Sequence, residues 1–98
     1  MRIAINGFGR IGRNIARHLL SNDDFKNIEL VAVNDLGSID ANAHLLKYDS
    51  VHGILDKDIQ VNSEKALISI DDKDVLYLSE RDPSNLPWSE LDIDFVFE

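Results

Sequence analysis

The sequence predicts an α/β domain with a mostly parallel sheet and a small antiparallel insertion. An apolar run, a glycine-rich turn, a periodic helical segment and a second apolar run follow one another within about thirty residues, which is typical of a βαβ unit. Further along, short β-type runs are separated by pairs of polar residues, which indicates antiparallel hairpins. A chain of 98 residues with 44% apolar residues is long enough for one hydrophobic core.

The predicted βαβ unit occupies the first third of the chain. Residues 3–5 are an uninterrupted apolar run, so we expect residues 2–6 to form a buried parallel strand, because such strands lack polar alternation. Residues 7–9 form the turn, and residues 10–21 the helix. Residues 28–34 are the second strand, and a right-handed crossover makes it parallel to the first. The predicted apolar face of the helix comprises Ile11, Ile15, Ala16, Leu19 and Leu20.

A second helix is predicted from residue 39 to residue 47, because Ser38 is a favourable N-cap residue. Ile39, Ala43 and Leu46 are spaced so that they share one face of this helix. The polar residues 21–24 predict a turn after the first helix.

The segment after Tyr48 predicts an antiparallel insertion and a return to the main sheet. Its strands are expected at residues 59–61, 67–70 and 75–78, with Asp71 and Asp72 at a hairpin tip. Two prolines make residues 81–88 a loop with one helical turn, in which Trp88 anchors the loop to the core. The last predicted strand is residues 93–97.

Charge and composition exclude several classes of partner. A formal net charge of −8 and a pI of about 4.6 argue against nucleic acid and anionic membranes, which require a basic face. The absence of cysteine excludes disulfides and Cys-based zinc sites. We expect no metal site, and the acidic cluster at residues 71–74 is interpreted as a solvated tip. The lack of cysteine makes a cytoplasmic setting the simplest expectation, and the N-terminus has no long apolar run typical of a secretory signal.

The turn contains a G-x-G-x-x-G pattern formed by Gly7, Gly9 and Gly12. In a dinucleotide site, the first glycine permits a tight turn, the second lets the backbone approach a pyrophosphate, and the third lets the helix pack against the strand. Asp35 ends the second predicted strand, where a carboxylate can accept a hydrogen bond from a ribose hydroxyl. The simpler alternatives are a connecting glycine turn and a solvated aspartate. The combination favours a Rossmann-type dinucleotide-binding domain.

Asp35 also predicts the choice of cofactor. Its carboxylate would repel the 2′-phosphate of NADP, and the nearest following cation is Lys47. The sequence therefore predicts NAD rather than NADP. Arg10 and Arg13 stand where a helix dipole disfavours cations, and a bound pyrophosphate would reverse that preference. We expect Arg13, which lies one turn further along the helix, to serve packing or an ion pair.

Four segments resemble the glyceraldehyde-3-phosphate dehydrogenase family. They are INGFGRIGR at residues 5–13, VAVND at 31–35, AHLLKYDSVHG at 43–53 and SERDPSNLPW at 79–88. The resemblance implies a homotetrameric enzyme of glycolysis that oxidises glyceraldehyde 3-phosphate to 1,3-bisphosphoglycerate with NAD and inorganic phosphate. It also implies that the backbone at Arg10 and Ile11 holds the pyrophosphate.

The resemblance extends to the adenosine end of the cofactor. It implies that Asp35 holds the ribose, that Asn34 lines the adenine side and that Arg81 lies near the adenine. The complete set of expected cofactor-binding residues is Asn6, Gly7, Phe8, Gly9, Arg10, Ile11, Gly12, Asn34, Asp35 and Arg81.

The family's catalytic residues have no counterpart in this sequence. Members continue into a Thr-Gly loop, a nucleophilic cysteine and a later histidine that acts as its base. We therefore expect residues 1–98 to be the N-terminal part of the NAD-binding domain, with the catalytic domain absent and no catalytic residue present. Erythrose-4-phosphate dehydrogenase and a non-catalytic nucleotide-binding module remain alternatives, and Asp35 and Asp82 favour the glyceraldehyde enzyme over the former.

The three histidines are not expected to be catalytic, because no nucleophile is present for a base to activate. His18 is expected at the surface or in packing, and His44 is expected to be packed. His52 lies in a predicted loop that in the resembling family favours subunit contacts.

Overall fold

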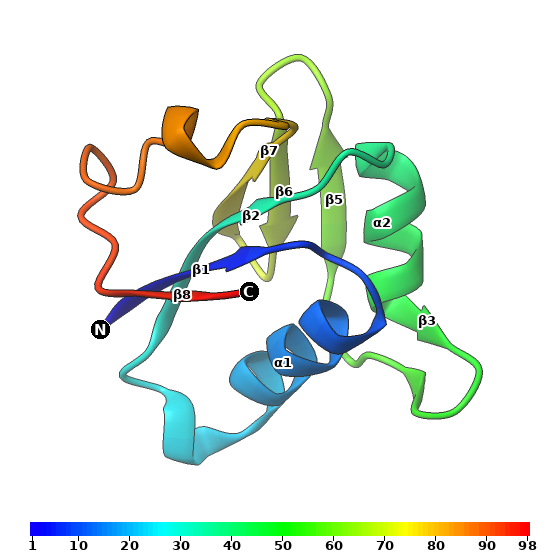
Figure 1. Cartoon of the computed structure of the whole chain (residues 1–98). Coiled ribbons are helices and arrows are strands. Elements are labelled where there is room, and N and C mark those ends of the chain that lie inside the picture. Colours follow the sequence, from blue (N-terminus) through cyan, green and yellow to red (C-terminus); the bar gives the residue numbers. More distant parts are fainter.

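A six-stranded sheet forms the centre of the computed structural model, which describes residues 1–98 (Figure 1). The strand order is β5-β6-β7-β2-β1-β8. The strands are β1 (Arg2–Asn6), β2 (Glu29–Asn34), β5 (Ile59–Asn62), β6 (Leu67–Ile70), β7 (Lys73–Leu78) and β8 (Phe95–Phe97). β1 is parallel to β2 and to β8, and β2 is parallel to β7, so the predicted mostly parallel α/β architecture is confirmed.

The predicted antiparallel insertion is part of the main sheet. β5, β6 and β7 form an antiparallel meander, as the alternation of short apolar runs and polar turns predicts. β7 also pairs with β2 in parallel, which places its end beside the end of β2. The meander therefore brings residues after β7 to the glycine turn, a proximity that the sequence pattern did not reveal.

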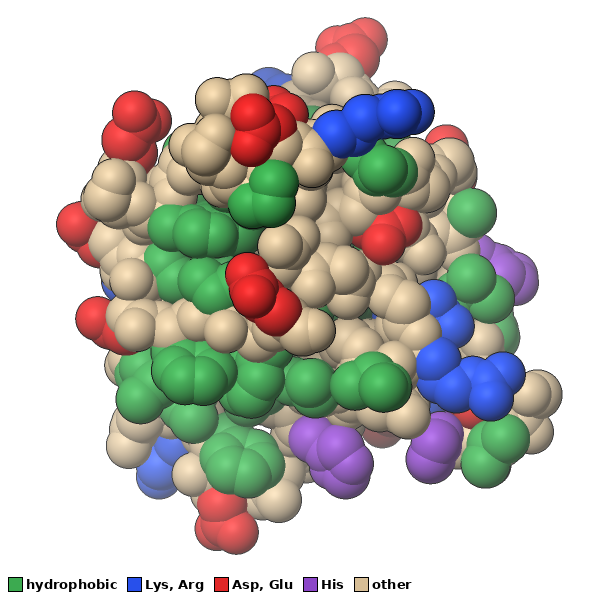
Figure 2. Space-filling model, viewed as in Figure 1, with side chains coloured by type: hydrophobic (Ala, Val, Ile, Leu, Met, Phe, Trp, Pro, Cys, Tyr) green, Lys and Arg blue, Asp and Glu red, His purple; other side chains and the backbone are tan.

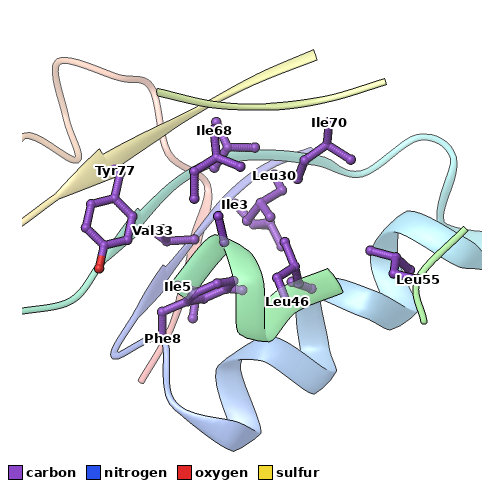
Figure 3. Close-up of a cluster of buried hydrophobic side chains, with 13 residues drawn as sticks. Ile3, Ile5, Phe8, Leu30, Val33, Leu46, Leu55, Ile68, Ile70 and Tyr77 are labelled. Carbon is purple, nitrogen blue, oxygen red and sulfur yellow. The ribbon is translucent and has the colours of Figure 1, made fainter. Parts of the chain in front are cut away.

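Both helices pack on one face of the sheet. α1 (Arg10–Ser21) and α2 (Ile39–Lys47) contribute buried residues to a core cluster that also contains Phe8, Ile3 and Ile5 (Figure 3). Each large aliphatic side chain buried there contributes roughly 1.5–3 kcal/mol relative to an exposed one. Strand alternation directs Ala4 to the opposite face, where it belongs to a second cluster against which Trp88 and Leu91 pack. The prediction that Trp88 anchors its loop is thus confirmed.

The ends of α1 are as predicted, but its apolar face is not. Ile11 was placed on the buried face and is instead 77% exposed. Successive residues lie about 100° apart around a helix, and the position facing the strand is taken by buried Gly12. Ala16 is buried, and Ile15, Leu19 and Leu20 pack against the core, so the rest of the predicted face is confirmed.

Several local predictions are confirmed. The hydroxyl of Ser38 accepts a hydrogen bond from the Ala41 N–H and caps α2. Asp71 and Asp72 adopt φ of 48° and 69°, the left-handed conformation that a tight hairpin tip requires. The polar turn after α1 contains the short 3₁₀ helix η1 (Asp23–Phe25), and the proline-containing loop contains η2 (Pro83–Asn85).

His52 lies in a turn, as predicted, and the residues on either side of this turn form a small hairpin that was not predicted. β3 (Tyr48–Asp49) and β4 (Gly53–Ile54) pair antiparallel as a separate two-stranded sheet. The N–H groups of His52 and Val51 donate to Asp49 Oδ1 at 2.8 and 2.7 Å, and these bonds lower the pKa of Asp49 to about 2. Two residues in the sequence indicated this turn. They are Asp49, whose side chain bonds to the backbone of the turn, and Gly53, whose φ is +80°.

The prediction that His44 is packed is wrong. His44 is exposed, and its ring lies over Tyr48 with a centroid distance of 4.8 Å. His18 and His52 are exposed as well, and Figure 2 shows histidine side chains at the surface. The alternation of His44 with apolar neighbours suggested burial, but Ala43 and Leu46 fill the side of α2 that faces the sheet.

Arg17 connects the two helices and the small hairpin. Its guanidinium donates to the carbonyls of Leu46 and Lys47 at the end of α2, at 2.9 and 2.7 Å, and to Gly53 at 2.7 Å. The last carbonyls of a helix have no partner within the helix, so a cation there satisfies them. No helix of the structure has the length and apolar character needed to cross a membrane.

Replacing Arg17 by methionine should destabilise the protein by about 1–3 kcal/mol, because three carbonyls lose their donor while the aliphatic packing is kept. Urea unfolding of the purified full-length protein measures the change. Arg10→Met is the matched control, because Arg10 is an exposed arginine of the same helix with no side-chain hydrogen bond, and it should leave the midpoint in place. Equal effects of the two variants would contradict the role of Arg17.

Candidate functional site

The glycine turn lies at the carboxyl ends of β1 and β2. Gly7 follows β1 with φ of +93°, a conformation that only glycine adopts without strain. Its N–H donates to the Asn34 carbonyl at 2.7 Å, which ties the turn to the end of β2. Ligands of open parallel sheets bind beyond the carboxyl ends of the strands, so this is the edge at which the fold places a site.

Gly9 and Gly12 serve the turn in different ways. A Cβ atom on Gly12 would lie 2.5 Å from the Gly7 carbonyl oxygen and 3.0 Å from a methyl group of Ile5, so α1 can approach β1 only because this position lacks a side chain. A Cβ atom on Gly9 would meet nothing within 4 Å. The protein itself therefore does not require glycine at Gly9, whereas a ligand close to the backbone would.

The N-terminus of α1 is arranged to receive an anion. Its N-cap residue is Gly9, no side chain caps it, and its first turn contains no acidic residue. The first N–H groups of a helix have no partner within the helix and carry partial positive charge. Arg10 and Ile11, which open the helix, are exposed. These features fit a pyrophosphate, because its oxygens accept from such N–H groups.

Arg13 lies beneath the turn. Its Nη1 donates to the Phe8 carbonyl at 3.3 Å, and its Nε is buried without a hydrogen-bond partner. No ion pair forms, so of the two expected roles the structure supports packing. The guanidinium nevertheless contributes positive charge that lowers the pKa of Asp35.

Asp35 is held by three hydrogen bonds. Its Oδ1 accepts from the Phe8 N–H at 3.0 Å, and its Oδ2 accepts from the Gly37 N–H and from Asn42 Nδ2, both at 2.9 Å. Partial burial alone would raise the pKa of Asp35. The hydrogen bonds from Gly37, Asn42 and Phe8, with the Arg13 charge, outweigh burial and hold this pKa below its usual value. The carboxylate is therefore ionised at neutral pH.

Asn34 joins the ends of three strands. Its Nδ2 donates to Asn6 Oδ1 at 2.9 Å and to the Glu80 carbonyl at 3.0 Å, and its Oδ1 accepts from the Glu80 N–H at 2.8 Å. The side chain is buried, so these bonds offset the cost of removing its amide from water. Asn34 thus links β1, β2 and the segment that follows β7.

The structure brings most of the expected binding residues to this edge, with two qualifications. The Phe8 side chain is 2% exposed and belongs to the core, so only its backbone can face a ligand, and its N–H is already bonded to Asp35. Arg81 lies near the site because its neighbour Glu80 is bonded to Asn34, but the Arg81 side chain is exposed and makes no hydrogen bond. A surface hollow of about 720 Å³ lies away from this site, between the end of α1 and the β6–β7 turn.

Sequence analysis missed the residues that support Asp35. Asn42 and Tyr77 are buried, and the Tyr77 hydroxyl accepts from Asn42 Nδ2 at 2.6 Å and donates to the Gly37 carbonyl at 2.7 Å. A buried Asn within the apolar face of a predicted helix was the available signal, because buried amides require partners. No sequence pattern indicated the role of Tyr77, because its hydroxyl lies near Gly37 only when β7 pairs with β2 in the folded sheet.

A parallel βαβ unit with an uncapped helix N-terminus and an ionised aspartate at the end of its second strand defines a dinucleotide-binding domain. The model of the family described as "Glyceraldehyde 3-phosphate dehydrogenase, NAD binding domain" matches residues 1–98, and the chain belongs to this family. NAD is accordingly the cofactor of this domain.

Curated relatives agree with this assignment. The chain is 57% identical over 98 residues to the glyceraldehyde-3-phosphate dehydrogenase of Mycoplasma pneumoniae and 50% identical over 98 residues to that of Geobacillus stearothermophilus. It is 48% identical over 98 residues to the chloroplastic glyceraldehyde-3-phosphate dehydrogenase A of Zea mays. All of this chain is covered in each comparison, but it spans only 28%, 28% and 24% of the respective relatives.

Substituting the two glycines by alanine should separate folding from binding. Gly12→Ala should destabilise the protein by about 1–3 kcal/mol, because the new methyl group displaces α1 from the Gly7 carbonyl. Gly9→Ala should leave the melting temperature unchanged but raise the Kd for NAD about tenfold, because its methyl group occupies the ligand's side of the turn. Calorimetric melting and NAD titration measure both effects. A destabilised Gly9→Ala variant that binds NAD normally would contradict this assignment.

Asp35 should stabilise the fold in a pH-dependent way. Because its pKa is lowered by folding, its stabilisation is present above the unfolded-state pKa of about 3.9 and is lost as the pH falls through the lower folded-state value. Asp35→Asn should therefore cost about 1 kcal/mol at pH 7, and the difference should shrink in acid. Urea unfolding between pH 7 and pH 3 tests this, with the exposed Asp74→Asn as control. A difference that is independent of pH would contradict it.

Proposed function

We propose that the chain is the NAD-binding part of an NAD-dependent phosphorylating dehydrogenase of glycolysis, which oxidises glyceraldehyde 3-phosphate to 1,3-bisphosphoglycerate. The observation that carries the proposal is the ionised Asp35 carboxylate beside the uncapped N-terminus of α1, in a chain that belongs to this family. Residues 1–98 form the N-terminal part of the NAD-binding domain in this proposal.

Each feature of the site has a defined part in cofactor binding. Backbone N–H groups at Arg10 and Ile11 bind the pyrophosphate. Gly7 permits the tight turn, and Gly9 lets the backbone approach the pyrophosphate. Asp35 accepts a hydrogen bond from the adenosine ribose. Asn34 lines the adenine side, and Asn6 accepts a hydrogen bond from the Asn34 side chain. Phe8 contributes through its backbone, and Gly12 lets the helix pack against the strand. Arg81 lies near the adenine, because it follows Glu80, whose carbonyl is bonded to Asn34. When bound, NAD supplies the hydride acceptor for the oxidation.

The remaining chemistry belongs to residues outside this sequence. The 98 residues contain no cysteine, so the thiolate that adds to the aldehyde carbonyl, and the histidine that activates this thiolate, lie elsewhere in the enzyme we propose. The other reactants are a small phosphorylated aldehyde and inorganic phosphate. We further propose a homotetramer in the cytoplasm. The name of the Zea mays relative shows that proteins of this family also occur in chloroplasts.

The full-length protein should prefer NAD to NADP by at least about tenfold in Michaelis constant, because Asp35 is charged and opposes a 2′-phosphate. Steady-state assays with glyceraldehyde 3-phosphate and inorganic phosphate measure both constants. Asp35→Ala should raise the Michaelis constant for NAD and reduce the preference. A native preference for NADP would contradict the assignment of Asp35.

The same assay distinguishes the alternatives. Faster turnover of erythrose 4-phosphate would support the related erythrose-4-phosphate dehydrogenase. NAD binding without turnover of either aldehyde by the full-length protein would support a non-catalytic nucleotide-binding module. Phosphate-dependent NADH formation from glyceraldehyde 3-phosphate would support the proposal.

A further inference from the structure

Asp35 is one member of a closed ring of hydrogen bonds that also includes Gly37, Asn42 and Tyr77. Asn42 Nδ2 donates to Asp35 Oδ2 and to the Tyr77 hydroxyl, and that hydroxyl donates to the Gly37 carbonyl. The Gly37 N–H donates to Asp35 Oδ2, which closes the ring. Both donors of the Asn42 amide and the single donor of Tyr77 are therefore used.

The ring is built into the core. Asn42 is 7% exposed and Tyr77 is 5% exposed. A Cβ atom on Gly37 would lie 3.0 Å from Asp35 Oδ2 and 3.1 Å from Asn42 Nδ2, so the turn closes tightly over these groups. An apolar pair could fill the same volume without the cost of burying an amide and a hydroxyl. The polar groups of the pair instead hold the carboxylate in place, because Asn42 donates to Asp35 Oδ2 and Tyr77 donates to the carbonyl of Gly37.

The ring leaves the two oxygens of Asp35 unequal. An ionised carboxylate offers about two lone-pair positions on each oxygen. Oδ2 accepts from two donors and is saturated, whereas Oδ1 accepts only from the Phe8 N–H. Oδ1 therefore keeps one free position, beside the glycine turn.

We propose that Asn42 and Tyr77 are positioning residues that determine the preference for NAD, by holding Asp35 so that Oδ1 receives the ribose hydroxyl. This inference rests on the proposed NAD-binding function. A fixed carboxylate is already oriented when NAD binds, which lowers the entropic cost of binding. The same immobility keeps the negative charge where the 2′-phosphate of NADP would lie. A carboxylate free to rotate would bind NAD less well and could turn away from NADP.

The test compares variants of the full-length protein in titrations with NAD and with NADP. Asn42→Leu keeps the volume but removes the donor to Asp35. It should raise the Kd for NAD about tenfold, with the Kd for NADP unchanged or lower, so that the preference for NAD falls about tenfold. Tyr77→Phe should reduce the preference about threefold, because Asn42 keeps its bond to Asp35 but loses its second partner.

A double variant and a control complete the design. If Tyr77 acts through Asn42, the variant carrying both Asn42→Leu and Tyr77→Phe should lose no more preference than Asn42→Leu alone. Ser79→Ala is the control, because the Ser79 hydroxyl donates to the backbone carbonyl of Asp35 and not to its carboxylate, at 3.1 Å. The Ser79→Ala variant should prefer NAD to NADP by the same factor as the native protein.

Three results would overturn the inference: equal weakening of NAD and NADP by Asn42→Leu, an unchanged preference in a variant that melts normally, or additive effects in the double variant. A melting curve for each variant identifies any general loss of structure. Failure of the native full-length protein to bind NAD would overturn the proposed function itself. Native NAD binding with an unchanged preference in both single variants would overturn only the inference about Asn42 and Tyr77.

Discussion

The close approach of α1 to the end of β1 is the constraint on which the site depends. The contact between Gly12 and the Gly7 carbonyl places the helix N-terminus over the turn and leaves the backbone at Gly9 open. The same turn presents the Phe8 N–H to Asp35, which connects the helix N-terminus that we propose for the pyrophosphate to the carboxylate that we propose for the ribose. One steric relationship between two glycines therefore determines where both recognition elements lie.

The arrangement also answers why cations occur where a helix dipole disfavours them. The chain has a net charge of −8, so a cofactor bearing phosphates approaches an acidic protein. The N-terminal turn of α1 is a local exception, with two arginines and no acid. Arg13 packs beneath the turn, where it donates to the Phe8 carbonyl, and its charge lowers the pKa of Asp35. Local charge, rather than net charge, determines what this edge of the sheet can bind.

Prediction from sequence succeeded where a local pattern has a single physical explanation. The bounds of α1, the Ser38 cap, the Asp71–Asp72 tip and the glycine turn follow from periodicity, capping and turn chemistry. It failed where the outcome depends on contacts distant in sequence. Ile11 has the right spacing for burial, but the space against the strand belongs to Gly12. Asn42 and Tyr77 meet only because β7 pairs with β2.

The position of β1 between β2 and β8 has a consequence for synthesis of the chain. Arg2 donates its N–H to the Asp94 carboxylate at 2.8 Å and accepts from the Asp94 N–H at 2.7 Å, so one edge of β1 is completed by residues from the far end of this sequence. At about 5–20 residues per second, a ribosome needs roughly 5–20 seconds to make the intervening segment. During that time β1 has an unpaired apolar edge, which is the kind of surface that chaperones cover in newly made proteins.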